Sequence, residues 1–258
     1  MTPERLGQHF LANASWRARI LEQIAPAKEQ VWLEIGAGRG EMTRELAARA
    51  GRVVAIELDA RFISKLREAT AGLNVEIVEG DFLALDLAQI GGPRFRVYGS
   101  LPYYITSPIL RKLFACADRI EEIDVVIQLE VAERLAARPH SRDYGWLSVL
   151  AQFYTRPQIL LRIPPGAFRP APKVDSALVR MTPPGEGARL GIEDEEGFLE
   201  FASACFAQKR KTLTNNLKGR YGAEKIREAL QTMRLSATAR AEEMSVAQLA
   251  ELYARVAG

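Results

Sequence analysis

The sequence predicts an α/β protein in which a doubly wound, mostly parallel sheet is followed by a small all-helical domain. Short apolar runs alternate with runs at helical spacing from residue 31 to residue 137, which is the pattern of strand–helix crossover units. A glycine-rich turn follows the first apolar run, and only helical periodicity remains beyond residue 190. We therefore expect a Rossmann-like domain over residues 1–183 and a helical domain over residues 190–258.

Size and composition limit the class of protein. The 258 residues are enough for one large domain and a smaller one, and the 48% hydrophobic content excludes a disordered chain. No apolar run reaches the length of a membrane span, and the N-terminus lacks the apolar core of a signal peptide. Cys116 and Cys205 show neither metal-ligand spacing nor a disulfide pattern. We expect a cytoplasmic protein with reduced thiols, no metal and no membrane contact.

The periodicity places the individual elements. The expected strands span residues 31–35, 53–57, 75–78, 95–98, 123–129, 158–163 and 176–181. The expected helices span residues 13–24, 41–49, 61–69, 108–114, 131–137, 146–154, 198–207, 212–217, 223–232 and 246–256, with a short helix near Leu85. Four prolines between Pro164 and Val174 exclude regular structure there, and at least one of the two flanking strands should be antiparallel. The segment from Thr182 to Arg189 has the composition of a hinge or linker.

The segment from Val31 to Gly40 has the pattern of a buried strand, a tight turn and a helix start. Gly36, Gly38 and Gly40 alternate with other residues directly after the apolar run. Such glycines permit left-handed backbone angles and let a ligand approach the main chain closely, while N–H groups at a helix start can hold a polar or anionic ligand. Alone, the turn is compatible with a dinucleotide, another nucleoside cofactor, or simple tight packing.

Acidic residues at the next two strand ends narrow this choice. Glu57 ends the second apolar run, where a carboxylate suits the two hydroxyls of a ribose, and Asp81 follows the third run, where it can accept from the amine of an adenine. The glycine turn lacks the spacing of the pyrophosphate fingerprint, so S-adenosylmethionine fits this trio better than a dinucleotide. The alternative is that both acids are capping or solvated loop residues.

The fourth strand ends in Tyr98-Gly-Ser-Leu-Pro-Tyr-Tyr104. The proline fixes the backbone and aims carbonyls into the expected cleft, and Tyr103 offers a flat face on which a base can stack. Phe168 stands in the proline-rich loop instead of a periodic apolar run, so we do not expect it in the main core. His9 has no nearby acid in sequence that would make it a catalytic base.

Basic residues concentrate in one stretch of the expected helical domain. Residues 207–220 contain no acid but include Lys209, Arg210, Lys211, Lys218 and Arg220. Such a stretch can contact phosphates. A solvated helix face is the alternative that charge by itself favours.

Several short motifs occur one after another along the chain. They are Leu6-Gly-Gln-His-Phe-Leu11, Leu33-Glu-Ile-Gly-Ala-Gly-Arg-Gly40, Ile56-Glu-Leu-Asp59, Gly80-Asp-Phe82, Ser100-Leu-Pro-Tyr103, Phe168-Arg-Pro-Ala-Pro-Lys-Val-Asp-Ser-Ala-Leu-Val-Arg180 and Gln208-Lys-Arg-Lys-Thr-Leu-Thr-Asn-Asn-Leu217. Together they resemble the motifs of the KsgA/Dim1 family of small-subunit ribosomal RNA adenine N6,N6-dimethyltransferases. The segment around residues 168–176 favours the small-subunit enzymes over the related antibiotic-resistance methylases of the large subunit.

The resemblance implies a class I S-adenosylmethionine-dependent methyltransferase domain and assigns roles to individual residues. The implied cofactor contacts are His9, Leu11, Gly36, Glu57, Asp81 and Ser100. The implied pocket for the target base consists of Ser100, Leu101, Tyr103 and Phe168. The implied partner is 16S rRNA within the immature small subunit, where two adjacent adenines of a hairpin loop near the 3′ end would be dimethylated. Nothing in the sequence indicates an obligate interface, so we expect a monomer.

Ser100 departs from the family pattern, which usually has asparagine at this position. Serine also offers an acceptor oxygen, but on a shorter side chain. Two alternatives remain open: a resistance-type adenine methylase of 23S rRNA, and a catalytically impaired assembly or RNA-binding factor. Ser100 lends weight only to the second of these.

Overall fold

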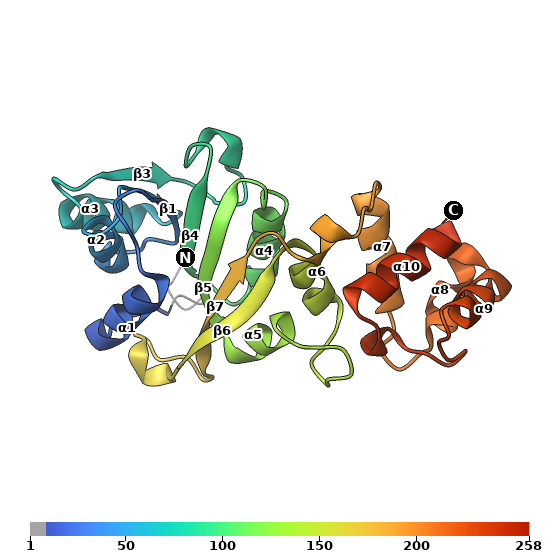
Figure 1. The fold of residues 1–258 in the computed structure, drawn as a ribbon. Coiled ribbons are helices and arrows are strands. Elements are labelled where there is room, and N and C mark those ends of the chain that lie inside the picture. The colour runs from blue at the N-terminus through green and yellow to red at the C-terminus, as the bar shows by residue number, and fades with distance from the viewer. Residues whose placement is uncertain (1–8, 258) are drawn as a thin grey trace. The chain divides into compact units, whose positions relative to one another are not determined.

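A computed structural model describes residues 9–257 of the chain (Figure 1). Its contacts divide the chain into two compact units. The first runs through Ala132 and resumes from Gln158 to Pro183, and the second comprises Glu133–Pro157 and the chain from Pro184 onward. The expected domains, residues 1–183 and 190–258, differ from these units mainly in the segment 133–157, which packs with the C-terminal helices.

The described chain forms one seven-stranded sheet with the order β3-β2-β1-β4-β5-β7-β6. The strands are β1 (Val31–Ile35), β2 (Arg52–Glu57), β3 (Val75–Glu79), β4 (Phe95–Ser100), β5 (Ile120–Gln128), β6 (Arg156–Ile163) and β7 (Ser176–Thr182). The five strands from β3 to β5 pair in parallel, whereas β7 is antiparallel to β5. The predicted doubly wound sheet with a late antiparallel strand is confirmed.

In the first unit α1 (Ala14–Ile24) precedes the sheet, α2 (Glu41–Ala47), α3 (Ala60–Ala69) and α4 (Thr106–Phe114) connect its strands, and a 3₁₀ turn covers Leu87–Gln89. The helix α5 (Leu129–Leu135) follows β5 and continues into the second unit. The helix α1 begins where the sequence predicts, because the Asn13 side chain accepts a hydrogen bond from the Trp16 amide at 3.3 Å. Its buried face contains Ile20, Leu21 and Ile24, one apolar stripe at helical spacing.

The strand register determines where the site forms. Ile35, the last residue of β1, lies opposite Ile56 of β2 and Gly99 of β4. Because these strands are parallel, the chain leaves all three at the same edge of the sheet. The glycine turn, Glu57 and Ser100 are therefore neighbours although they are far apart in sequence.

The second unit is helical apart from the start of β6. It contains α6 (Trp146–Tyr154), α7 (Glu195–Cys205), α8 (Leu213–Tyr221), α9 (Ala223–Thr232) and α10 (Val246–Ala257). Phe198 and Phe201 of α7 are fully buried in its core. Ser245 caps α10, since its Oγ accepts from the Gln248 amide at 3.2 Å.

The expected hinge at 182–189 is packed against α6 for most of its length. The Gly185 amide donates to the Tyr154 carbonyl at 2.9 Å, and a 3₁₀ turn covers Glu186–Arg189. A side chain at Gly185 would place its Cβ 2.4 Å from the Thr155 nitrogen, so only glycine fits there. Gly185, one of the residues that gave the segment a linker composition, is thus a close-packing residue.

No helix among residues 9–257 is long and apolar enough to cross a membrane.

Candidate active site

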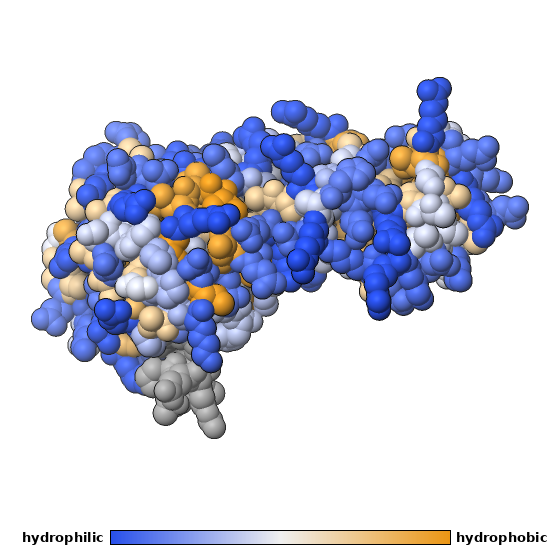
Figure 2. Space-filling model, turned by 90° about the horizontal axis from the view of Figure 1, so that it is seen from below, coloured by the Kyte–Doolittle hydropathy of each residue, from blue (hydrophilic) through white to orange (hydrophobic). Residues whose placement is uncertain are grey.

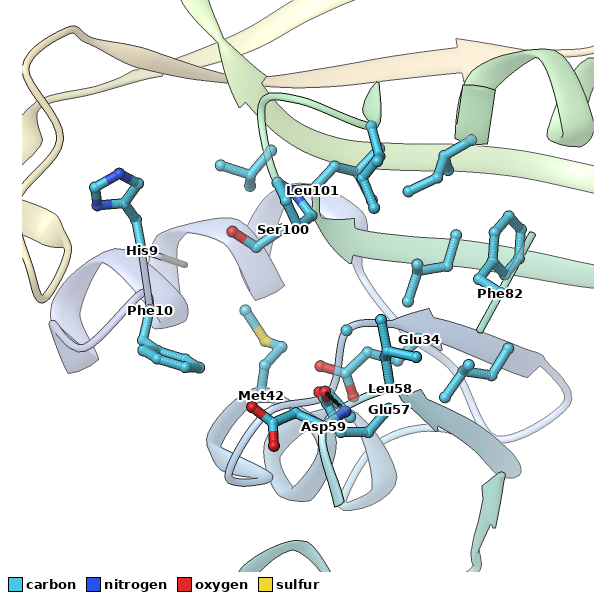
Figure 3. Close-up of a pocket in the computed structure, with 18 of the residues that line it drawn as sticks. His9, Phe10, Glu34, Met42, Glu57, Leu58, Asp59, Phe82, Ser100 and Leu101 are labelled. Carbon is cyan, nitrogen blue, oxygen red and sulfur yellow. Dashed lines mark hydrogen bonds between the residues drawn. The ribbon is translucent and has the colours of Figure 1, made fainter. Parts of the chain in front are cut away.

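A cavity of about 510 Å³ opens at the carboxyl edge of the sheet, within the first unit (Figure 3). A volume of this size accommodates a nucleoside-sized ligand. The residues proposed from the sequence as site residues all line it: His9, Leu11, Gly36, Glu57, Asp81, Ser100, Leu101, Tyr103 and Phe168. Segments as distant as residues 9 and 176 therefore contribute to one pocket.

The glycine turn takes the backbone conformation that its sequence predicts. Gly36, Gly38 and Gly40 have φ angles of 74°, 58° and 87°, in the left-handed region that disfavours side chains. The Gly36 and Ala37 amides both donate to the Ile56 carbonyl, at 2.9 and 3.1 Å. The turn is thereby fixed to the end of β2, next to Glu57.

Glu57 is 5% exposed and is bound by the main chain on both sides. Its Oε2 accepts from the Gly38 amide at 2.6 Å, and its Oε1 accepts from the Asp59 amide at 2.8 Å. Each carboxylate oxygen has a second lone pair, so both can still accept from a hydroxyl. The sequence left open whether Glu57 caps the main chain or binds a ligand. Its geometry allows it to do both.

Asp81 lies at the next strand end and is exposed toward the pocket rim. Its Oδ1 accepts from the Leu83 amide at 2.9 Å, which fixes the carboxylate in a turn after β3. The second oxygen of a carboxylate held in this way remains available as an acceptor at the rim.

The segment His9–Leu11 is fastened to the proline-rich loop. Phe10 and Arg169 exchange two backbone hydrogen bonds, at 3.0 and 2.8 Å, and His9 Nδ1 lies 2.8 Å from the Pro170 carbonyl oxygen. The Phe10 ring packs edge-on against Phe62 with ring centroids 5.3 Å apart. Sequence reasoning missed Phe10, although it stands between two proposed cofactor contacts. Leu6, Gly7 and Gln8 of the same motif lie outside the described residues.

Tyr103 is held from two sides. Its hydroxyl lies 3.1 Å from Ser176 Oγ, and its ring centroid lies 5.6 Å from that of His9 with the planes tilted by 32°. Partial burial raises the pKa of Tyr103 above its ordinary value, so the ring stays neutral at physiological pH. Sequence reasoning did not assign Ser176, although its motif was quoted.

Phe168 corrects an expectation drawn from the sequence. It is 2% exposed and belongs to the core cluster that includes Ile163 and Leu178. A 3₁₀ turn at Pro165–Ala167 folds the loop back, where the Ala167 carbonyl accepts from the Asn13 amide at 3.1 Å. The proline-rich loop thus carries its aromatic residue into the core, and the same residue lines the cavity.

The end of β4 presents the remaining predicted residues. Ser100 is half-buried and lies opposite Val126 of β5, and the Leu101 amide donates to the Val126 carbonyl at 3.0 Å. Figure 3 shows the Ser100 hydroxyl directed into the pocket on the side of His9. The hydroxyl is therefore placed to contact a ligand.

Glu34 is a site residue that sequence reasoning missed. It lines the pocket at 3% exposure, and its Oε2 has no hydrogen-bond partner among residues 9–257. Burial, with repulsion from Glu57 and Glu41, raises the pKa of Glu34 to about 8. The available signal was a single acid within the otherwise apolar run of β1. A buried polar atom left without a partner marks a place where a polar group of a ligand can bind.

Apolar side chains also reach the surface at the pocket mouth. Among the described residues, the large hydrophobic side chains that are exposed are Leu58, Tyr104 and Val174, and the first two line the pocket. Figure 2 shows that apolar patches interrupt an otherwise mainly hydrophilic face. Exposed apolar groups beside a pocket are typical of binding surfaces.

The sheet order, the glycine turn and the acids at successive strand ends define a class I S-adenosylmethionine-dependent methyltransferase. Solved structures support this class. The 23S rRNA methyltransferase ErmE superposes with a TM-score of 0.75 at 30% identity, over 96% of this chain and 100% of that one. A dimethyladenosine transferase from Plasmodium falciparum shares the fold with a TM-score of 0.79 at 22% identity, over 95% and 96% of the two chains.

The family is shown by sequence. The family model for ribosomal RNA adenine dimethylase matches residues 2–257, and the chain belongs to this family. Two relatives named ribosomal RNA small subunit methyltransferase A are similar to it. The one from Koribacter versatilis is 42% identical, over 96% of this chain and 92% of the relative, and the one from Acidobacterium capsulatum is 44% identical, over 96% and 89%. The chain is thus an S-adenosylmethionine-dependent rRNA adenine dimethyltransferase.

Proposed function

We propose that this protein methylates N6 of two adjacent adenines in a hairpin loop near the 3′ end of 16S rRNA, during maturation of the small ribosomal subunit. The observation that carries the proposal is the single pocket in which Glu57 and Asp81 lie together with the Ser100–Tyr103 strand end. Sequence identity supports the small subunit as the target. The chain is 42–44% identical to two relatives named for that subunit and 30% identical to a 23S rRNA methyltransferase.

The cofactor side of the pocket is built from the first three strand ends. S-adenosylmethionine supplies a methyl group that its sulfonium already activates. Glu57 would accept from the ribose hydroxyls and Asp81 from the adenine amine, which is the order in which β2 and β3 lie in the sheet. Gly36 allows close approach of the main chain, and His9 and Leu11 would close the pocket from the fastened N-terminal segment.

The acceptor side of the pocket must make the target amine of the substrate more nucleophilic. The N6 amine of adenine is a poor nucleophile because its lone pair is delocalised into the ring. Ser100 Oγ and the Leu101 carbonyl would accept hydrogen bonds from its two N–H groups and so favour a tetrahedral nitrogen. By holding the amine next to the activated methyl group, the pocket would supply most of the remaining acceleration. The methylated amine is acidic enough to lose its proton to water, so the pocket needs no strong general base.

The target base must leave its stack before it reaches the pocket. A hairpin loop lowers the free energy of this step, because its bases are less constrained than those of a duplex. Tyr103 and Phe168 would replace the lost stacking, at about 1–3 kcal/mol for a base on an aromatic face. Tyr103 offers the more accessible ring, since Phe168 is almost completely buried.

Ser100 is the critical position for this proposal. We propose that its hydroxyl still accepts from N6, either because the base sits closer to the strand or because a water bridges the gap. The alternatives are a 23S rRNA methylase and an assembly factor that binds without transfer. As a monomer acting on assembling subunits, the protein would work in the cytoplasm.

The experiment is methyl transfer from labelled S-adenosylmethionine to small subunits isolated from a strain that lacks this activity. Mass spectrometry of the digested rRNA should locate dimethyladenosine at two adjacent positions near the 3′ end of 16S rRNA. Protein-free 23S rRNA is the matched control and should remain unlabelled. Labelling of 23S rRNA alone, or cofactor binding without transfer to either RNA, would contradict the proposal.

A further inference from the structure

Glu34 has no role in the steps above, yet it is the most unusual acid of the pocket. It lies two residues before the glycine turn on β1, a strand whose other residues are apolar. Figure 3 shows its carboxyl group facing the pocket space near Met42 and Glu57. At 3% exposure, and with Oε2 lacking a hydrogen-bond partner within the described chain, this carboxyl is in surroundings that disfavour a charge.

The groups around Glu34 do not supply a positive charge. From α2 it faces Glu41 and the Thr43 hydroxyl, and from the end of β2 it faces Glu57. The Thr43 hydroxyl is near enough to lower the pKa of Glu34 in part. The two groups do not form a hydrogen bond, because Thr43 Oγ1 has no partner among the described residues. From β4 it faces Tyr98, a buried phenol that stays neutral. Acids and neutral groups therefore form its surroundings.

The arginines that line the pocket are committed elsewhere. Arg17 Nε pairs with Glu45 Oε1 at 2.9 Å, and Arg17 Nη1 donates to the Leu11 and Ala12 carbonyls at 3.1 and 2.9 Å. Arg61 Nε donates to Asp59 Oδ1 at 2.8 Å. Burial first, and the two neighbouring acids next, raise the pKa of Glu34 to about 8. Glu34 is therefore a neutral acid at pH 7.

We propose that Glu34 carries its proton until the cofactor binds, and releases it to solvent when the cofactor's α-ammonium group comes to lie beside the carboxyl. The O–H bond of Glu34 breaks, the proton passes to water or buffer, and the ammonium then balances the carboxylate. No covalent bond to the ligand forms. One proton leaves for each cofactor bound.

The choice of the amino-acid end follows from the order of the strands. Glu57 and Asp81 stand at the ends of β2 and β3 and are proposed to take the ribose and the base. Glu34 lies on β1, before the turn, which leaves the amino-acid end of the ligand for it. The inference rests on that proposed placement of the cofactor and needs no assumption about the RNA.

The consequence is selection for the complete cofactor. A nucleoside thioether without the amino-acid portion brings no cation to Glu34, so the acid keeps its proton and gains little from the ligand. A ligand with the α-ammonium replaces an unsatisfied buried acid by a charge pair, which is the stronger kind of hydrogen bond. Glu34 would thus be a specificity residue for the amino-acid end.

The test is titration calorimetry with S-adenosylhomocysteine in two buffers, phosphate and Tris, whose ionisation enthalpies differ. The dependence of the apparent enthalpy on the buffer gives the number of protons released. At pH 7 we expect close to one proton for the wild-type protein, since an acid with a pKa of about 8 is mostly protonated there. Glu34→Gln should release close to none and bind at least tenfold more weakly, whereas the neighbouring Glu41→Gln should still release a proton.

Two measurements on the wild-type protein make the test independent of any variant. Methylthioadenosine, which lacks the amino-acid portion, should bind without releasing a proton. With S-adenosylhomocysteine the released proton number should fall by more than half between pH 7 and pH 8.5. Equal proton release by Glu34→Gln and wild type, or none by wild type at pH 7, overturns the inference. Loss of rRNA methylation alone would contradict the proposed function and leave this inference intact.

Discussion

The Tyr103 hydroxyl lies 3.1 Å from Ser176 Oγ, a contact that joins the turn after β4 to the first residue of β7. Ser176 is 1% exposed and pairs with Gln128 of β5, so its position is fixed by the sheet. The His9 ring limits Tyr103 from another direction. The tilt of the proposed stacking platform is therefore set by a buried strand, although Tyr103 itself stands in a turn.

Ser176→Ala removes the hydrogen bond that fixes this tilt. A neutral hydrogen bond contributes about 0.5–1.5 kcal/mol, so kcat for adenine dimethylation should fall about three- to tenfold. The affinity for S-adenosylhomocysteine should stay unchanged, because Ser176 contacts the acceptor side. Ser176→Thr keeps the hydroxyl and should restore kcat. Steady-state kinetics on undermethylated small subunits measures both variants, and an equal loss of cofactor affinity would show a general structural role instead.

Ser100 can be examined by shortening and by lengthening the acceptor. Ser100→Ala removes the proposed hydrogen bond to N6 and should lower kcat at least tenfold with little change in cofactor affinity. Ser100→Asn restores the residue usual in the family and should retain or increase activity. The readouts are the rate at which dimethyladenosine forms, followed by mass spectrometry of the digested rRNA, and the affinity for S-adenosylhomocysteine. If the alanine variant is as active as wild type, then Ser100 does not accept from the amine.

Glu57 serves both the fold and the ligand. In Glu57→Gln one of the two main-chain amides, Gly38 or Asp59, would face an NH₂ group instead of an acceptor. We expect a loss of about 1–3 kcal/mol in unfolding free energy and at least tenfold weaker binding of S-adenosylhomocysteine. Chemical denaturation and calorimetry measure the two effects. Glu79→Gln is the matched control at the neighbouring exposed strand end, and should change neither quantity.

The raised pKa of Glu34 also makes stability depend on pH. The unfolded chain ionises this acid near pH 4.5, whereas the folded protein holds the proton up to about pH 8. The folded state binds more protons between these values, so this group's contribution to stability falls as pH rises through that window. Glu34→Gln removes this penalty and should raise Tm by several degrees at pH 8 but change it little at pH 5. Thermal unfolding of both proteins at pH 5 and pH 8 measures these changes in Tm. An equal change in Tm at the two pH values would show that the raised pKa of Glu34 is not the cause.

Local patterns in the sequence predicted the elements well. The alternation of runs placed each strand of the sheet to within a few residues, and the helix expected over residues 13–24 matches α1 within one residue. The glycine turn and the acids at strand ends predicted one pocket, because parallel strands carry their ends to a common edge. These features depend on neighbours in the chain, which a sequence displays directly.

Features that depend on which distant segments meet were not predicted. Phe168 is buried because residues 10 and 169 pair across the chain, and no local pattern records that pairing. The helix α6 has buried apolar residues, but its sequence did not reveal that it packs with the C-terminal helices. The sequence shows Glu34 as a single acid within a strand, but only the structure shows that its Oε2 lacks a hydrogen-bond partner among the described residues.

Replacing basic residues of the second unit can distinguish a contact with RNA from a solvated surface. Lys209, Arg210 and Lys211 are exposed in the turn between α7 and α8, and acids are absent from residues 207–220. If they contact phosphates, replacing all three by alanine should weaken rRNA binding and lower the slope of log affinity against log salt by about 2–3. Binding of S-adenosylhomocysteine should not change.

The control for this variant is Lys225→Ala with Arg227→Ala on α9, where Glu224 and Glu228 already balance the exposed charges. This pair should leave the salt slope nearly unaltered, because a locally neutral face attracts few phosphates. Filter binding of 16S rRNA fragments at several salt concentrations measures both slopes. The slope is proportional to the number of phosphates that the protein neutralises. Equal slopes for the triple variant and wild type would therefore favour the solvated face over the RNA contact.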